Sequence, residues 1–465
     1  MRVCFLLEPL EPRITLSAGF IATDGIPGGA ITFDFNGRAP EFPSFAFQPN
    51  GKLLASDRDS SSDCGTFLLR FNPDGSRDRD FGAKTPTQLC DSSGLHQLLA
   101  LRDGSFYAVS MDGVFHFNPD GRMDSSFTSD AALANMDFID FIAPTGDGHI
   151  LVAGEIWTDD FATTPSQLAL FRLNSDGAPD LSFGASGALA EQYASPFYSA
   201  WDLIVQPDGK ILVQASDGDG YHANVLRFNA DGTPDDSFAT HGQFSFGPDD
   251  YVGPMLLQPD GKIVEILDTL DVTLTRLNPD GPLDHSFGHD GRTSYWWHKY
   301  HYWDTAFLQP DGKIIAIAED NLIARFNSNG SLDSSFGFGG SIKIISPDPH
   351  FDYILDNAVL RGDHLLLFLL KGTLNSDGDW KLFSSHLLDI TTSSNGPSNS
   401  FSADGNFMIV APDSPLLQHR SFPVTDDATS WEIADQSSDD APTPQDSIWD
   451  DSHDPLDWEV SADLL

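Results

Sequence analysis

The chain has 465 residues, with 69 Asp plus Glu against 25 Lys plus Arg, and its formal net charge is −44. Hydrophobic residues make up 40% of it, which is enough for a sizeable core and excludes a wholly disordered chain. The charge argues against a nucleic-acid partner, because binders of nucleic acid need basic patches. No apolar run approaches the roughly 20 residues of a transmembrane helix.

The first 29 residues are predicted to form a leader that ends in the glycine-rich DGIPGG. Within it, LLEPLEPRITLSA is similar to the Leu-Glu-Pro-Arg segment that opens many large planctomycete surface proteins, and this resemblance implies export. Acidic residues and prolines interrupt any apolar stretch, so it is not an ordinary signal peptide. The alternative is a short unstructured leader. The next stretch, Ala30 to Asn36, is predicted to be a strand that pairs with the last repeat and closes a ring.

Two motifs alternate through the middle of the chain. The first is an apolar run, Gln-Pro-Asp-Gly-Lys and a second apolar run; its turn glycines Gly209, Gly261 and Gly312 are 52 and 51 residues apart. The second reads Arg, apolar, Asn-Pro-Asp-Gly and then Asp-x-x-Phe, as in RLNPDGPLDHSFG from Arg276. Counting weaker copies, seven units recur, and the seventh keeps only Phe401 of the second motif.

Each unit predicts four strands. Apolar runs of four to seven residues, separated by Asp-Gly, are typical of strands joined by tight hairpins, since glycine adopts positive φ readily. A single meander cannot bury both of its faces, so seven of them would pack side by side around a central axis. We therefore predict an all-β, seven-bladed β-propeller of four-stranded antiparallel blades over residues 30–410.

The paired QPDGKILV and RLNPDG signatures resemble the delta-60 repeat, a bacterial tandem repeat assigned to β-propeller proteins of undefined function. The resemblance covers about residues 40–410 and implies the same fold. Blades two, three and seven depart from it in the first motif, which affects the blade boundaries more than the fold.

The residues that recur in every unit are predicted to be structural. We expect Phe to fill the core between blades while Arg and Asp pair at its edge, since a catalytic group is not needed identically in each blade. The Asp residues are Asp78, Asp124, Asp180, Asp235, Asp284 and Asp333, and each stands three positions before its Phe; His116 replaces the Arg once.

Variable segments are where we predict binding. In a four-stranded meander the two repeated turns lie at one face and the variable segments at the other, and function is usually carried by variable loops. The link before the sixth blade, TSYWWHKYHYW, is dense in aromatic residues that suit stacking on sugars or a protein hot spot. The alternative is that alternate residues are only buried strand positions. The candidate ligand-binding residues are Tyr295, Trp296, Trp297, His298, Tyr300, His301 and Trp303.

Asp-x-Asp pairs in the second connections are candidate calcium ligands, because hard cations prefer clustered carboxylate oxygens. Ordinary Asp-Gly hairpins look the same without metal. The residues are Asp57, Asp59, Asp217, Asp219, Asp377 and Asp379. Cys64 and Cys90 either pair, if the protein is exported, or are two isolated thiols.

Residues 411–465 contain fourteen acidic residues and a single base, Arg420, and are predicted to be a disordered tail. The sequence thus predicts a secreted or cell-surface, monomeric propeller that binds a glycan or protein without a cofactor. The alternative is a propeller hydrolase or lyase with carboxylates or calcium at the channel mouth. Three or more Asp, Glu or His residues converging there would favour the enzyme.

Overall fold

The computed structural model divides the chain into two compact units, Met1–Phe422 and Pro423–Leu465. All residues whose structure it describes lie in the first unit, and every structural statement below concerns them. They are residues 30–33, 44–58, 66–73, 76–84, 87–89, 94–111, 113–157, 167–184, 187–190, 197–217, 222–247, 250–251, 253–268, 272–295, 303–318, 321–346, 348, 350–361, 364–374, 380–391 and 408–410.

The described strands form small antiparallel sheets, which we number 1 to 7 along the chain. Sheet 1 consists of β2 (Phe45–Phe47), β3 (Leu53–Arg58), β4 (Thr66–Phe71) and β5 (Thr87–Leu89). Sheet 2 has three strands, β6 (Leu95–Ala100), β7 (Phe106–Ser110) and β8 (Val114–Phe117). Sheet 3 consists of β9 (Phe138–Pro144), β10 (Ile150–Ile156), β11 (Gln167–Leu173) and β12 (Ala188–Ala190). Two short helical turns, η1 (Phe81–Lys84) and α1 (Asp130–Leu133), lie between the strands.

The later sheets repeat this order. Sheet 4 consists of β13 (Phe197–Val205), β14 (Ile211–Asp217), β15 (His222–Phe228) and β16 (Gln243–Ser245). Sheet 5 consists of β17 (Met255–Leu257), β18 (Ile263–Asp268), β19 (Val272–Leu277) and β20 (Arg292–Tyr295). Sheet 6 consists of β21 (Trp303–Leu308), β22 (Ile314–Ala318), β23 (Leu322–Phe326), β24 (Ser341–Ile345) and β28 (Met408–Val410). Sheet 7 consists of β25 (Asp352–Arg361), β26 (His364–Leu374), β27 (Trp380–Thr391) and β1 (Ala30–Phe33).

The N-terminal strand completes the last sheet, as its sequence predicts. β1 pairs antiparallel with β27, from Ala30 opposite Leu388 to Phe33 opposite Ser385. Sheet 7 therefore takes its outer strand from the start of the chain, whereas β28, which follows it in sequence, adds a fifth strand to sheet 6. This exchange joins the two ends of the repeat array.

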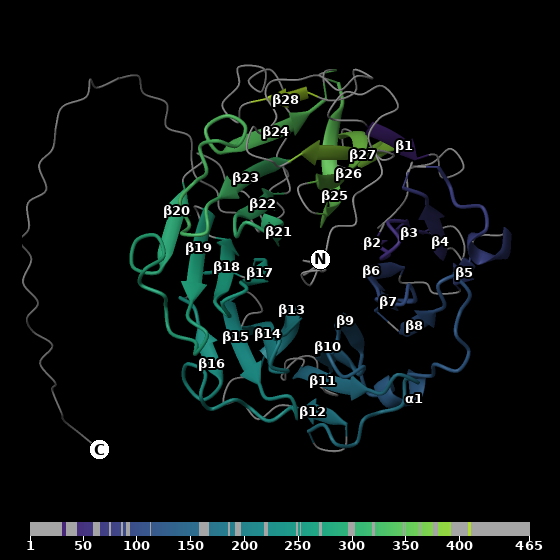
Figure 1. Cartoon of the computed structure of the whole chain (residues 1–465), viewed down its shortest axis with the longest axis vertical. Coiled ribbons are helices and arrows are strands. Elements are labelled where there is room, and N and C mark those ends of the chain that lie inside the picture. Colours follow the sequence, from purple (N-terminus) through teal and green to yellow (C-terminus); the bar gives the residue numbers. More distant parts are fainter. Residues whose placement is uncertain are drawn as a thin grey trace, which may run out of the picture. The chain divides into compact units, whose positions relative to one another are not determined.

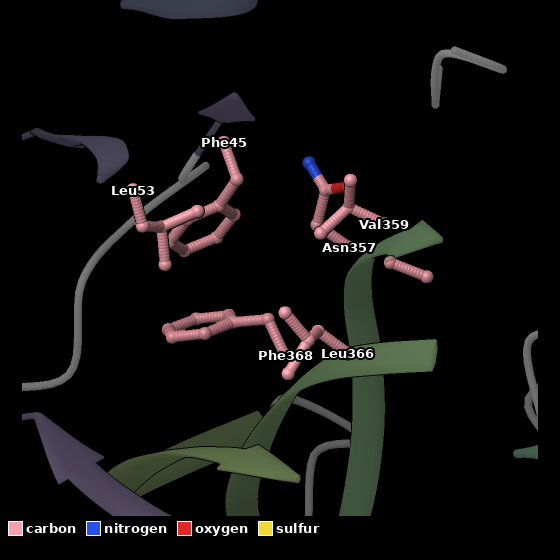
Figure 2. Close-up of a pocket in the computed structure, with 7 residues that line it drawn as sticks. Phe45, Leu53, Asn357, Val359, Leu366 and Phe368 are labelled. Carbon is pink, nitrogen blue, oxygen red and sulfur yellow. The ribbon is translucent and has the colours of Figure 1, made fainter. Parts of the chain in front are cut away.

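The sheets follow one another around a ring in which the first strand of each lies nearest the centre (Figure 1). β2 packs against both β6 of sheet 2 and β25 of sheet 7, so the first and last sheets are neighbours. At that junction Phe45 and Leu53 face Leu366 and Phe368 across a small apolar cavity (Figure 2). Its volume is about 10 Å³, room for about one water molecule, so it is a packing defect rather than a ligand pocket.

The recurring Arg, Asp and Phe residues form the predicted structural unit. In sheet 5 the Arg276 Nε donates to Asp284 Oδ2 at 2.8 Å, and the guanidinium lies 4.5 Å from the centre of the fully buried Phe287 ring. Arg276 Nη1 also donates to the Ser328 carbonyl of sheet 6 at 2.7 Å. The same Arg–Asp bond recurs in sheets 1, 3, 4 and 6, and His116 replaces the Arg in sheet 2 at 3.0 Å. In sheets 1, 3, 4 and 5 the Arg also donates to a backbone carbonyl of the next sheet, which fits the predicted structural role.

Candidate functional site

The repeated turns share one face of the ring. Lys262 in the first turn of sheet 5 lies 2.9 Å from Asp284, which follows the third turn. Equivalent Lys–Asp pairs join the two turns in sheets 1, 4 and 6. We call this the turn face. The opposite face, where the second connections and the links between sheets begin and end, is the link face. On the turn face, the repeated Lys and Asp charges form these structural pairs.

A β-bulge recurs near the link-face end of the first strand in five sheets. The pairing of the first strand with the second skips one residue in β6, β9, β13, β21 and β25. Bulges re-aim side chains and are common beside active sites. The skipped residues are His96, Asp140, Trp201, Asp304 and Asp356, and in β13 the pairing is also irregular between Phe197 and Ala200.

Asp140 belongs to a polar cluster on sheets 3 and 4, which we call the Asp140 cluster, with Glu155, Trp157 and Ser199. The Ala200 backbone N–H donates to Asp140 Oδ2 at 3.3 Å. Ser199 Oγ donates to Glu155 Oε1 at 2.5 Å, and Trp157 Nε1 donates to Glu155 Oε2 at 3.3 Å. All four residues lie near the link-face ends of strands or, for Trp157, one position beyond.

Burial sets the chemistry of this cluster. Asp140 is only 7% exposed, and its burial, reinforced by the negative charge of Glu155, raises its pKa to about 8 against one opposing hydrogen bond from Ala200. Asp140 therefore holds a proton at neutral pH. Glu155 and Trp157 are half-buried and reach solvent. A proton-bearing carboxyl thus lies beside a second carboxyl, a hydroxyl and an indole ring.

The predicted aromatic site is only partly described. Tyr295 ends β20 of sheet 5, and its hydroxyl accepts a hydrogen bond from the Leu332 backbone N–H of sheet 6 at 2.5 Å. Its ring packs 5.3 Å from that of Phe326. Trp303 begins β21, although its side chain is outside the described residues. The link thus runs from the outer strand of sheet 5 to the first strand of sheet 6, and Trp296, Trp297, His298, Tyr300 and His301 lie outside the described residues.

Two of the six predicted calcium ligands lie at the link-face ends of second strands. Asp57 is the second-to-last residue of β3, and Asp217 is the last residue of β14. The side chains of both lie outside the described part of the structure. Asp59, Asp219, Asp377 and Asp379 lie outside the described residues, as do Cys64 and Cys90. Among the described residues no group of three or more His, Cys, Asp or Glu could hold a metal ion.

Sequence reasoning missed the Asp140 cluster because its members are far apart and stand inside strands. One signal was present: Asp140 and Glu155 are acidic residues within otherwise apolar runs, FIDFIAP and ILVAGEI. The bulge that places Asp140 has no sequence signature of its own, because it depends on the register of two strands.

The ring of small antiparallel sheets, joined by recurring turns and tied by recurring Arg–Asp–Phe units, defines a β-propeller repeat protein. The family model that matches the chain is described as "Domain of unknown function (DUF5122) beta-propeller", and it matches residues 145–183, 206–238 and 309–336. These segments contain the repeated turns of sheets 3, 4 and 6. No curated protein sequence matches the chain significantly.

Solved structures that resemble the chain share little sequence with it. They include a catalytically inactive virginiamycin B lyase from Staphylococcus aureus (10% identity, 78% of this chain and 98% of that one, TM-score 0.45). A puromycin hydrolase is 12% identical over 82% of this chain and 55% of that one, with a TM-score of 0.49. The WD40 β-propeller domain of Doa1 is 12% identical over 77% and 97%, with a TM-score of 0.44. Of the helices that the structure describes, none has the length and apolar character of a membrane span.

Proposed function

We propose that the chain is a secreted or cell-surface β-propeller binding module that takes a glycan on its link face, at the Asp140 cluster. One observation carries this proposal: the half-buried indole of Trp157 lies beside Glu155 and Ser199, which are hydrogen-bonded to each other. Sugar rings stack on indole faces while carboxylates accept hydrogen bonds from sugar hydroxyls, so this grouping has the chemistry of carbohydrate recognition.

The finer architecture is part of the same proposal. We take the propeller to be a monomer of seven four-stranded blades over residues 30–410, of the delta-60 type, preceded by a planctomycete-type leader and followed by an acidic tail. The aromatic link between sheets 5 and 6 would extend the binding face, and the Asp-x-Asp pairs would hold calcium there.

A glycan array with the purified full chain tests the proposal. We expect Trp157→Ala and Glu155→Gln each to weaken binding of the best glycan by about tenfold or more, as removal of a central contact does at a binding site. Tyr251→Ala is the matched control, because Tyr251 is an exposed aromatic residue (43%) on sheet 4 and outside the cluster. Equal binding by wild type and both cluster variants would refute the proposed site.

A hydrolase or lyase is the second candidate, and the proton on Asp140 favours it. Paired carboxyls of which one holds a proton at neutral pH are the usual acid–base arrangement of glycan-cleaving enzymes. The cluster contains two carboxyls rather than three or more acidic or His side chains, which is why binding ranks first. Release of reducing ends from a bound glycan, abolished by Asp140→Asn while binding persists, would establish the enzyme.

A further inference from the structure

The interface between sheets 4 and 5 contains a buried polar layer between two apolar clusters. On one side of the layer Ile204 and Leu212 of sheet 4 pack against Met255 and Ile263 of sheet 5. On the other side Ala223 packs against Leu267. Side chains alternate along a strand, so the residues between these clusters face the same interface. They are Asp202, Gln214 and Ser216 on sheet 4 and Glu265 and Thr275 on sheet 5, which we call the polar layer.

Hydrogen bonds to the start of β17 bring the layer together. Asp202 accepts hydrogen bonds from the backbone N–H groups of Leu203, at 2.8 Å, and Met255. Gln214 Nε2 donates to the Gly253 carbonyl at 2.8 Å. Glu265 is the cross-strand partner of Met255, which places its side chain next to the residue that Asp202 binds.

The polar layer has more acceptors than donors. Glu265 is 0% exposed, and neither of its carboxyl oxygens has a hydrogen-bond partner. Gln214 Oε1 and the hydroxyl oxygens of Ser216 and Thr275 also have none, and these residues are fully buried as well. A buried polar group without a partner costs about 1–3 kcal/mol. An occupant that binds oxygen atoms would satisfy these groups.

Charge narrows the choice of occupant. Among the described residues neither Asp202 nor Glu265 has a Lys, Arg or His partner, so two buried carboxyls face each other uncompensated. A buried charge is tolerated only when it is paired or binds a metal.

We propose that the polar layer binds one calcium ion, held by the Glu265 carboxylate with Gln214 Oε1, the Ser216 and Thr275 hydroxyls and Asp202. Calcium takes six to eight oxygen ligands and accepts neutral oxygens beside carboxylates. The layer offers five unpartnered oxygen atoms, two from Glu265 and one each from Gln214, Ser216 and Thr275, and Asp202 adds a sixth. Binding there would lock sheets 4 and 5 together, independently of any ligand on the link face.

Metal analysis of the full chain tests the proposal directly. Protein unfolded with EDTA, refolded with calcium and desalted is expected to retain about one calcium per chain. Refolding with EDTA alone should lower the Tm, because a ligand that binds only the folded state stabilises it. Glu265→Gln should lose the bound calcium and the response of the Tm. Asp140→Asn, which changes a buried carboxyl on the neighbouring sheet, should keep both.

Two further measurements keep the outcome decisive. If Glu265→Gln does not fold, Thr275→Val removes one oxygen without changing shape and should weaken calcium retention. A wild-type protein that retains no calcium and melts at the same temperature with calcium and with EDTA would overturn the proposal. In that case the layer holds water and shared protons, and Glu265→Gln should leave the Tm unchanged or raise it.

Discussion

The Arg–Asp pair of sheet 5 allows a quantitative prediction for Asp284→Asn. Asp284 Oδ2 accepts from Arg276 Nε at 2.8 Å and lies 2.9 Å from Lys262 Nζ. The Arg276 and Asp284 side chains are 9% and 7% exposed. Removing one partner of a buried ion pair costs about 3–5 kcal/mol, because the other charge stays buried. Lys262 is 26% exposed, so we expect the lower end, about 3 kcal/mol.

Urea unfolding followed by tryptophan fluorescence measures this loss. Asp124→Asn is the matched control, because Asp124 has the same position in sheet 2 but pairs with His116, and these side chains are 26% and 15% exposed. Its effect should be well below that of Asp284→Asn. A loss under about 1 kcal/mol for Asp284→Asn, or equal losses for the two variants, would refute the argument that burial makes the pair structural.

The pH dependence of the same unit has a definite sign. Burial of Asp284 acts to raise its pKa, but hydrogen bonds from Ser286 and Lys262 and the charge of Arg276 outweigh it and lower the pKa. A lowered pKa in the folded state gives stability that is present above the unfolded pKa of about 3.9 and lost as pH falls through the folded value. The difference between wild type and Asp284→Asn should therefore shrink below about pH 4.

Three other outcomes follow from the structure. Gly330→Ala should destabilise by about 1–3 kcal/mol more than Gly148→Ala, because both have positive φ but only at Gly330 would a Cβ lie 2.6 Å from the Phe287 ring; urea unfolding of both variants checks this. Deleting residues 1–33 should lower the Tm and promote aggregation by exposing the edge of β27, whereas deleting residues 1–29 should not. Burial raises the pKa of Asp140 to about 8, so the folding stability contributed by its proton is full below the unfolded pKa of about 3.9 and is lost as pH rises towards 8. The Tm values of wild type and Asp140→Asn should therefore converge in acid and depend differently on pH above about pH 4.

The repeated part of the fold was readable from the sequence because local rules determine it. Asp-Gly turns at Gly209, Gly261 and Gly312 fix hairpins, and each has a φ between +83 and +85°. Arg and Asp recur eight residues apart, one before and one after the third turn. Because that turn reverses the chain, the two side chains were predicted to pair. The closing strand was predicted over Ala30–Asn36 because a ring removes an exposed sheet edge, and the structure has it at Ala30–Phe33.

The candidate site was not readable, because it depends on register and on contacts between sheets. Asp140 takes its position from a bulge in β9, and Glu155 meets it only because β10 pairs with β9 in that register. Ser199 comes from another sheet, 44 residues beyond Glu155. The strand number also escaped local rules: β28 joins sheet 6 although it follows sheet 7 in sequence.

The Arg–Asp–Phe unit and the bulge of the first strand both recur from sheet to sheet, but they differ in whether the residue type recurs as well. The Arg–Asp–Phe unit repeats both its geometry and its residues, as expected when every sheet must solve the same packing problem. The bulge repeats its geometry in five sheets, and its residue is Asp in sheets 3, 6 and 7 but His96 in sheet 2 and Trp201 in sheet 4. A packing requirement alone would not place Asp, His and Trp at equivalent positions. A rigid frame that presents different polar and aromatic side chains at one repeated position suits a binding surface, and this supports the proposal that the ligand binds on the link face, where the bulges lie.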